Sequence, residues 1–202
     1  MDAETFAHGG KRLNAGRKPI GEKRAGPPHV RRPRIERLLP VHVTMRMAPT
    51  VYNLRSRRSF AVIARALVIA GERFGVRILE FSVQGNHIHL VVEAATHEAL
   101  SRAMQGFSIR VAKNLNAMMN RRGRVLASRY HARVLTEPFD AWNVVRYVRN
   151  NHRRHMAQVG KFLPPTFVDP FASPHPDVDL PVPRTWILRR SAGPPRQCAR
   201  EC

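Results

Sequence analysis

The sequence predicts an α+β protein: a ferredoxin-like βαββαβ chain with an antiparallel sheet and one extra helix at the C-terminal end. Two observations predict it. Some short stretches alternate apolar and polar residues, as strands do, and longer ones repeat apolar residues every three or four positions, as helices do. These stretches also follow one another in the order of the split-βαβ motif. Such a chain is expected to pack its helices on one face of the sheet and leave the other face free.

The expected elements are, in chain order, strand 41–47, helix 59–74, strand 76–83, strand 87–93, helix 98–120, strand 130–135 and helix 138–155. The first strand is indicated by its alternation of apolar and polar side chains. The helix after it has an apolar stripe that runs from Ile63 to Phe74, and Gly75 is expected to end it.

A hairpin, a long helix, a short strand and a final helix complete the predicted domain. The turn Gln84-Gly85-Asn86 separates two runs of strand-forming residues, which indicates that the chain turns straight back. The long helix carries apolar residues at three- and four-residue spacing from Leu100 to Leu115. Pro138 stands in the first turn of the last helix, where its missing N–H is not needed.

Both ends of the chain differ in composition from the middle. Residues 1–38 are rich in Lys, Arg, Gly and Pro, and we expect them to form a flexible basic arm. Residues 161–202 are Pro-rich and are expected to be largely irregular, with one apolar island, Trp186-Ile187-Leu188, that is able to dock on the domain. The folded domain is therefore placed at 39–160.

Charge and composition restrict the partner and the compartment. The 202 residues include 35 Lys+Arg and 14 Asp+Glu, which gives a net charge of +21. Charge of this sign and size attracts polyanions, usually nucleic acid, and exceeds what solubility requires. There is no disulfide framework, no signal-peptide pattern and no apolar run of the roughly 20 residues that span a membrane, so a cytoplasmic protein without a membrane partner is expected.

Two histidines on one predicted strand suggest a metal site. Side chains two apart in a strand point to the same face, so His87 and His89 lie together while Ile88 and Leu90 face the core. Two neighbouring imidazoles are spaced to bind one divalent ion. Taken alone, however, such a pair is more often a pair of hydrogen-bonded structural histidines.

The last predicted helix supplies a candidate third ligand and a candidate nucleophile. Tyr147 and Asn151 are four residues apart, so they share one helix face, one turn from each other. The amide oxygen of Asn151 is suited to complete a His, His, Asn ligand set, and such a set with open positions favours Mg²⁺ or Mn²⁺ over structural zinc. On the helix alone, Tyr147 is better explained as a core tyrosine with its hydroxyl at the surface.

Four segments recur in this order and spacing in a known family: Arg32-Pro33-Arg34-Ile35, Gly85-Asn86-His87-Ile88-His89-Leu90-Val91-Val92, Arg129-Tyr130-His131 and Arg146-Tyr147-Val148-Arg149-Asn150-Asn151. By these segments the region from about 32 to 155 resembles the HUH single-tyrosine transposases, especially the REP-associated tyrosine transposases of bacteria. The resemblance implies that His87 and His89 bind the metal ion, that Tyr147 is the nucleophile and that Asn151 is the third ligand.

Two positions depart from the pattern of this family. The family often has Pro where this chain has Gly85, and Asn-Pro where it has Asn151-His152. Both changes leave the four proposed functional side chains in place. We therefore expect a divergent but active branch.

The resemblance implies a DNA transposase and single-strand endonuclease. In that activity the Tyr147 oxygen attacks a phosphodiester of hairpin-forming single-stranded DNA, and the covalent 5′-phosphotyrosine allows the strand to be rejoined. A divalent ion, Mg²⁺ or Mn²⁺, would polarise the phosphate. Two alternatives from another class stay open: a hairpin-DNA-binding protein without catalysis, and an RNA-binding ferredoxin-like domain with structural histidines.

Oligomeric state is also open. A homodimer could exchange its last helices, or a monomer could use its own. The short link Thr136-Glu137-Pro138 favours a self-contained monomeric site.

Basic residues on and after the long helix are expected to follow the DNA backbone: Arg102, Arg110, Lys113, Arg121, Arg122 and Arg124. Taken singly, each is better explained as a solvated surface charge. Tyr130 is the rival nucleophile, and its place at the start of a strand disfavours it. His131 is expected either to orient the substrate or to lie in the sheet.

Overall fold

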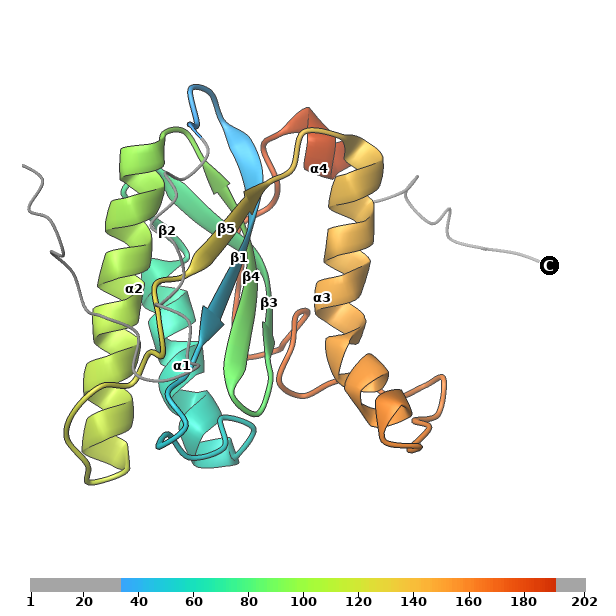
Figure 1. The fold of residues 1–202 in the computed structure, drawn as a ribbon. Helices are drawn as coiled ribbons and strands as arrows, with labels where there is room; N and C mark the ends of the chain where they lie inside the picture. The colour runs from blue at the N-terminus through green and yellow to red at the C-terminus, as the bar shows by residue number, and fades with distance from the viewer. Residues whose placement is uncertain (1–33, 192–202) are drawn as a thin grey trace, which may run out of the picture. The chain divides into compact units, whose positions relative to one another are not determined.

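The computed structural model describes residues 34–191. Its elements are β1 (Leu39–Arg46), α1 (Arg57–Ala70), β2 (Glu72–Arg73), β3 (Val76–Val83), β4 (His87–Ala94), α2 (His97–Met118), β5 (His131–Val134), α3 (Pro138–Gln158) and α4 (Trp186–Ser191). The five strands form one antiparallel sheet in the order β2-β3-β4-β1-β5 (Figure 1). The predicted α+β class and the βαββαβ order are confirmed, with the short strand β2 added.

The helices α1 and α2 cover one face of the sheet and enclose the main core (Figure 1). The strand β4 contributes Ile88, Leu90 and Val92 to this core, and each is 0% exposed. From α2, Phe107 and Leu115 reach the same core, as the three- and four-residue spacing predicted.

The opposite face of the sheet is not free, which corrects the sequence-based expectation. The helices α3 and α4 lie on this face, so the sheet is enclosed between two helical layers (Figure 1). A second apolar cluster fills the interface: Leu39, Leu79, Val91, Leu135, Ala141, Val144, Val148, Ile187 and Leu188. This cluster fixes α3 against the sheet and so determines which of its side chains face the strands.

The helix α1 ends earlier than predicted, at Ala70, with Gly71 as its C-cap. Phe74 and Gly75 instead form the turn between β2 and β3, with φ values of 55° and 73° in the left-handed region. Phe74 is therefore 53% exposed and not part of the buried stripe. The error has a physical source, because a glycine after an apolar residue ends a helix and turns a hairpin equally well.

Residues 161–191 have little regular structure apart from α4, but part of this segment runs along β3. The backbone N–H of Ser173 donates to the Phe81 carbonyl at 2.9 Å, and the Ser173 hydroxyl accepts from the Phe81 N–H at 3.0 Å. The N–H of Val83 donates to the carbonyl of Phe171 at 2.8 Å. These bonds cover a stretch of the β3 edge that the short strand β2 leaves unpaired.

Two buried carboxylates anchor the same segment. Asp169, whose side chain is 6% exposed, accepts from both terminal guanidinium nitrogens of Arg55 at 2.8 and 3.0 Å. Glu93 on β4 is 0% exposed and accepts from the backbone N–H of Thr185 at 2.6 Å and from its hydroxyl at 2.7 Å. Arg77 supplies the compensating charge to Glu93 at 3.2 Å. The start of α4 is therefore held on the sheet.

The predicted arm and the end of the chain fall mostly outside the described residues, which exclude 1–33 and 192–202. Ile35, from the last part of the predicted arm, is 4% exposed and belongs to the main core. Between residues 34 and 191 no helix combines the length and the apolar character needed to cross a membrane.

The cap of α2 provides a test of the fold. The hydroxyl of Thr96 accepts from the Ala99 N–H at 3.1 Å. We expect Thr96→Ala to lower the free energy of unfolding by about 1 kcal/mol, because a helix N–H loses its partner. Urea denaturation measures this, with Thr166→Ala, at an exposed position in the irregular segment, as the control. Equal effects of the two substitutions would contradict the assigned cap.

Candidate functional site

The register of β1 and β4 gathers polar side chains on the sheet face that carries α3. Thr44 pairs with His89, and Arg46 pairs with His87. His42 lies two residues before Thr44, so it faces the same side. The core residues of both strands alternate with these positions and point to α1 and α2.

His89 lies at the centre of this group and is 5% exposed. Its Nδ1 is 3.1 Å from His42 Nε2 and 3.2 Å from Thr44 Oγ1, whereas its Nε2 is buried without a hydrogen-bond partner. Burial, and then the nearby His42, lower the pKa of His89 to about 3, so the ring is neutral at pH 7. A neutral imidazole with an unpartnered nitrogen is the form that binds a metal ion.

His87 lies beside His89, with 4.8 Å between the ring centroids. Its Nδ1 is 2.8 Å from Asn86 Oδ1, a contact that orients the ring. Burial, then His155 and Arg46, lower the pKa of His87, so this ring too favours the neutral form. Both histidines therefore have one nitrogen engaged by a neighbour.

The helix α3 presents Tyr147, Asn151 and His155 at i, i+4 and i+8, on the side that meets the histidines. The Tyr147 ring is 5.3 Å from the His89 ring, centroid to centroid, at an interplanar angle of 86°. Asn151 is 1% exposed, and its amide nitrogen has no partner. One chain therefore brings His87, His89 and Tyr147 together, and the helix turn after Tyr147 carries Asn151.

The donor set fits a divalent cation. The buried, unpartnered Nε2 of His89 is a polar atom that a metal ion would satisfy. The unpartnered amide nitrogen of Asn151 is a hydrogen-bond donor, so Asn151 would bind a cation through its side-chain oxygen. No three His, Cys, Asp or Glu side chains within residues 34–191 are grouped to hold a metal ion. The predicted set of two imidazoles and an amide is of a different composition. Such a set leaves coordination positions open for a phosphate, as a catalytic metal requires.

Sequence reasoning missed two neighbours of the site. Burial, then Arg133 and His131, lower the pKa of His42 to about 4, and its ring stacks on His89 at 5.2 Å. His155 lies 5.7 Å from His87, ring to ring, and its Nε2 is buried without a partner. The signal for His155 was available, because it follows Asn151 by four residues on the same helix. No such signal was available for His42, because its contact with His89 depends on the register between β1 and β4.

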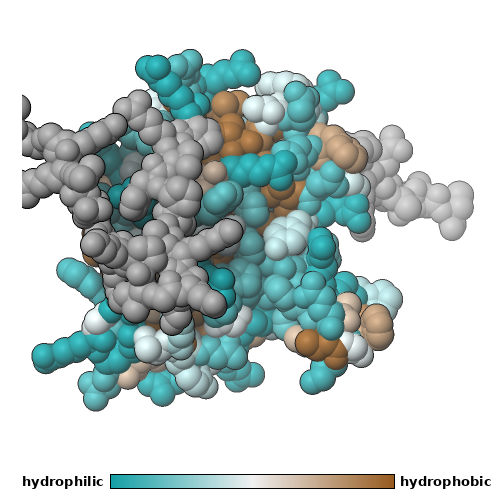
Figure 2. Space-filling view, in the orientation of Figure 1, coloured by the Kyte–Doolittle hydropathy of each residue, from teal (hydrophilic) through white to brown (hydrophobic). Residues whose placement is uncertain are grey.

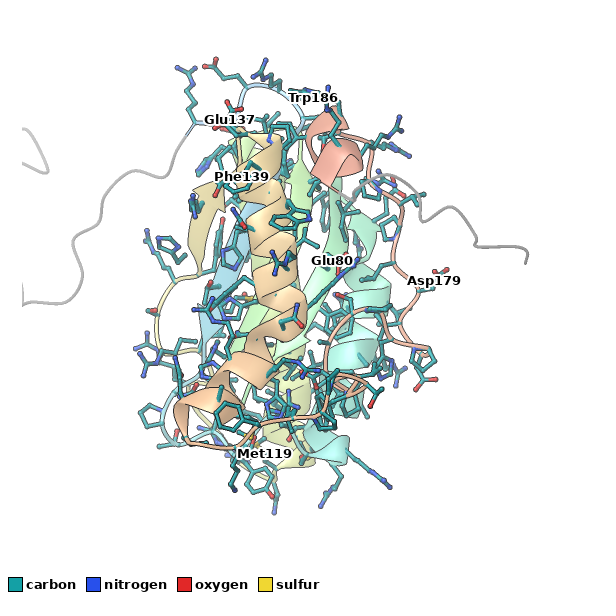
Figure 3. The ribbon with its side chains drawn as sticks, turned by 90° about the vertical axis from the view of Figure 1, so that its right-hand side faces the viewer. Glu80, Met119, Glu137, Phe139, Asp179 and Trp186 are labelled. Carbon is teal, nitrogen blue, oxygen red and sulfur yellow. The ribbon has the colours of Figure 1, made fainter. Side chains whose placement is uncertain are left out.

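An ion pair with β3 adds to the apolar contacts that hold α3 on the sheet. Arg149, two residues after Tyr147 on the helix, forms an ion pair with Glu80 of β3. The hydroxyl of Ser173 donates to the same carboxylate. Glu80 lies beside the middle of α3 in Figure 3. This carboxylate therefore joins a strand, the tyrosine-bearing helix and the C-terminal segment.

The predicted DNA-binding residues lie elsewhere. All six are on α2 or in the loop after it, in the layer across the sheet from Tyr147: Arg102, Arg110, Lys113, Arg121, Arg122 and Arg124. Two of them hold this loop: Arg121 donates to Thr50 Oγ1 and Arg124 donates to the Leu126 carbonyl. Their contact with DNA stays a prediction.

The rival nucleophile Tyr130 packs against the main core, under α1 and α2, and not beside the histidine pair. His131 begins β5 and is exposed. Of the two tyrosines weighed as nucleophiles, Tyr147 is the one whose ring contacts the His89 ring.

The sequence matches the family described as "Transposase IS200 like" over residues 45–151, more than half of the 202 residues. The chain belongs to this transposase family. The matched region begins in β1 and ends at Asn151, so it contains His87, His89, Tyr147 and Asn151, whereas His42, Thr44 and His155 lie outside it. The predicted membership of the HUH single-tyrosine transposases is thereby confirmed.

A solved structure supports the fold of the transposase, and two others are similar to it at lower scores. A REP-associated tyrosine transposase bound to a REP hairpin matches with a TM-score of 0.51 and 14% identity, over 63% of this chain and 74% of that one. A candidate transposase from Deinococcus radiodurans matches with a TM-score of 0.42 and 13% identity, over 63% and 97% of the two chains. A bacterial tRNA(His) guanylyltransferase-like protein with GTP follows, with a TM-score of 0.40, 11% identity and coverages of 63% and 68%. No curated protein sequence matches the chain.

Proposed function

We propose that this transposase cuts and rejoins single-stranded DNA through a covalent bond to Tyr147, with a divalent cation held by His87, His89 and Asn151. The observation that carries the proposal is the 5.3 Å contact of the Tyr147 and His89 rings, beside a buried Nε2 that has no partner. A purely binding domain has no need for a phenol next to an unsatisfied imidazole pair.

In the proposed reaction the Tyr147 oxygen attacks phosphorus, so an O–P bond forms while the P–O3′ bond breaks. The phenol loses its proton and the departing 3′ oxygen gains one, which leaves a 5′-phosphotyrosine and a free 3′-hydroxyl. A bound Mg²⁺ or Mn²⁺ would polarise the phosphate and offset its charge. The reverse attack by another 3′-hydroxyl releases Tyr147 and joins two strands. The protein's part is to align the phenol with the phosphate.

Hairpin-forming single-stranded DNA is the proposed substrate. The related REP-associated tyrosine transposase was solved bound to a REP hairpin. The net charge of +21 supports a nucleic-acid partner. A single strand, unlike a duplex, is free to bring its backbone to a half-buried tyrosine on the side of a helix.

The proposal is tested with the full chain, Mn²⁺ and a labelled single-stranded hairpin oligonucleotide. We expect a protein–DNA adduct that survives denaturation and disappears when the metal is chelated. The same sequence as a blunt duplex is expected to form no adduct. If the hairpin is bound but no adduct forms with Mn²⁺ or Mg²⁺, the protein is a binder and the proposal is wrong.

The contact between His42 and His89 predicts an effect on metal affinity. We expect His42→Phe to weaken Mn²⁺ binding by about 10- to 100-fold, because the bond that orients His89 is lost while the stacked ring remains. Isothermal titration calorimetry without DNA measures this. His175→Phe, in the segment after α3 where the ring contacts Phe60 and Phe81, is expected to bind Mn²⁺ like the unchanged protein. An affinity of His42→Phe equal to that of the unchanged protein would show that His42 does not orient a metal ligand.

A further inference from the structure

The outward face of α3 carries a row of aromatic, arginine and asparagine side chains that are exposed, except for the half-buried Trp142. Phe139, Trp142, Arg146, Asn150 and Arg154 follow at intervals of three and four residues, so they form one stripe along the helix. We call these five residues the α3 stripe. The opposite side of the helix is the one that packs on the sheet through the second apolar cluster.

The aromatic end of the α3 stripe is stacked but open to solvent. Phe139 is 74% exposed, and its ring stacks on Trp142 at 6.1 Å and 24°. The guanidinium of Arg146 lies 4.2 Å from the centroid of the Trp142 ring. Figure 3 shows Phe139 near the N-terminal end of α3, on the side that faces the viewer. Exposed aromatic rings interleaved with arginine are what single-stranded nucleic acid stacks on.

The basic end of the α3 stripe reaches the candidate nucleophile. Arg154 lies 5.3 Å from the centroid of the Tyr147 ring. A hollow of about 460 Å³ opens here, lined by Asn143, Arg146, Tyr147, Asn150, Arg153 and Arg154. Tyr147 thus lies between this hollow and the His89 ring on its other side.

Positive charge on this face is available to a ligand. Arg149 is engaged by Glu80, and Arg153 donates to carbonyls of the segment after the helix. Among the described residues, Arg146 and Arg154 have no carboxylate partner. The surface over α3 in Figure 2 is mostly hydrophilic, with apolar side chains visible near its N-terminal end. The α3 stripe therefore complements a polyanion that also carries flat apolar groups.

We propose that the α3 stripe binds the single-stranded DNA next to the cleaved phosphodiester, with bases stacked on Phe139 and Trp142 and phosphates at Arg146 and Arg154. This rests on the proposed function, because it gives the substrate a path to Tyr147. Phe139 and Tyr147 are separated by about 12 Å along the helix, which suits roughly two to four nucleotides.

The structure offers a matched control on the other side of the sheet. Phe74 is also an exposed phenylalanine beneath an arginine, with the guanidinium of Arg73 4.8 Å from its ring centroid. It lies in the β2–β3 turn, beside α2, and lines a separate groove with Arg110 and Lys113. Substitution at Phe74 removes a similar side chain without touching α3.

The test uses fluorescence anisotropy of the full chain with hairpin oligonucleotides that have no flank or single-stranded flanks of increasing length. We expect Phe139→Ala and Arg146→Ala each to weaken binding of flanked hairpins by roughly 5- to 100-fold and to leave binding of blunt hairpins unchanged. Arg146→Ala should also reduce the slope of log affinity against log salt by about one. Phe74→Ala, beside the predicted DNA contacts Arg110 and Lys113, should keep the full gain in affinity that the single-stranded flank gives the unchanged protein.

Tryptophan fluorescence gives an independent readout. The sequence has two tryptophans, so Trp186→Phe leaves Trp142 as the one reporter. Trp186 is 58% exposed on α4. We expect flanked hairpins to quench the remaining fluorescence and blunt hairpins to leave it unchanged. No quenching by flanked DNA at saturation would overturn the proposal.

The outcomes separate this inference from the proposed chemistry. If the unchanged protein forms the covalent adduct but Phe139→Ala and Arg146→Ala bind flanked hairpins normally, the α3 stripe is not the DNA path and the tyrosine mechanism stands. If no adduct forms but both variants lose flank-dependent affinity, the tyrosine mechanism is wrong and the binding of the single strand along the α3 stripe is supported. An equal loss in Phe74→Ala would overturn the assignment of the path to α3.

Discussion

Tyr147→Phe is expected to abolish covalent adduct formation and to lower strand transfer by on the order of 1,000-fold or more, because no other group replaces the attacking oxygen. The ring itself remains, so its edge contact with His89 and its contact with Arg154 persist. Hairpin affinity and Mn²⁺ affinity should therefore stay within a factor of a few of the unchanged values. The measurement is a denaturing gel of labelled oligonucleotide after incubation with metal.

Tyr130→Phe is the matched control for this result. It removes the same oxygen from a tyrosine that packs against the main core, across the sheet from His89. We expect this variant to form the adduct at the normal rate. An adduct in Tyr147→Phe that disappears in Tyr130→Phe would move the nucleophile to the other face and refute the assignment.

Asp169→Ala is expected to cause the largest loss of stability of the substitutions considered. It leaves Arg55, whose side chain is 13% exposed, without its bidentate partner and breaks the attachment of the C-terminal segment near β3. Breaking a buried ion pair costs about 3–5 kcal/mol. For a protein of this size that loss lowers Tm by roughly 6–20 °C, which differential scanning calorimetry measures.

Asp179→Ala provides the comparison for Asp169→Ala. Asp179 belongs to the same segment but is exposed and points away from the protein in Figure 3. Its loss should change the free energy of unfolding by no more than about 0.5 kcal/mol. The double change Arg55→Met with Asp169→Leu should recover part of the stability, since no uncompensated charge remains. Similar Tm values for Asp169→Ala and Asp179→Ala would show that this pair is not an anchor.

Local patterns predicted most of the fold. The strand 76–83 and the start of α3 at Pro138 agree with the structure, because alternation and helix-start signals are properties of neighbouring residues. The sequence indicated that the island Trp186-Ile187-Leu188 is able to dock on the domain, but not that it would help to cover the second face of the sheet. Ile187 and Leu188 meet α3 next to the point where Glu93 holds Thr185 on the sheet. Thr185 and Glu93 are 92 positions apart, so the residues next to each of them in the sequence do not indicate this contact.

The candidate site was predictable for a similar reason, and only in part. His87 and His89 share a face by strand geometry, and Tyr147 and Asn151 share one by helix geometry. The contact between the two pairs follows from the packing of α3, which the sequence indicated through family resemblance alone. The contact of His42 with the site could not be predicted from the sequence, because its bond to His89 is set by the pairing of β1 with β4.

The carboxylate of Glu80 joins the part of the chain that matches the family to the segment beyond that match. Arg149 of the tyrosine helix and Ser173 of the irregular segment both depend on it. Ser173 lies beyond residue 151, where the match to the family ends. A substitution in this C-terminal segment would loosen the tyrosine helix through Glu80. It would then lower the activity of the transposase while the histidines and the tyrosine stayed in place. Two copies of such a chain with the same histidines and the same tyrosine would then differ in their ability to move DNA.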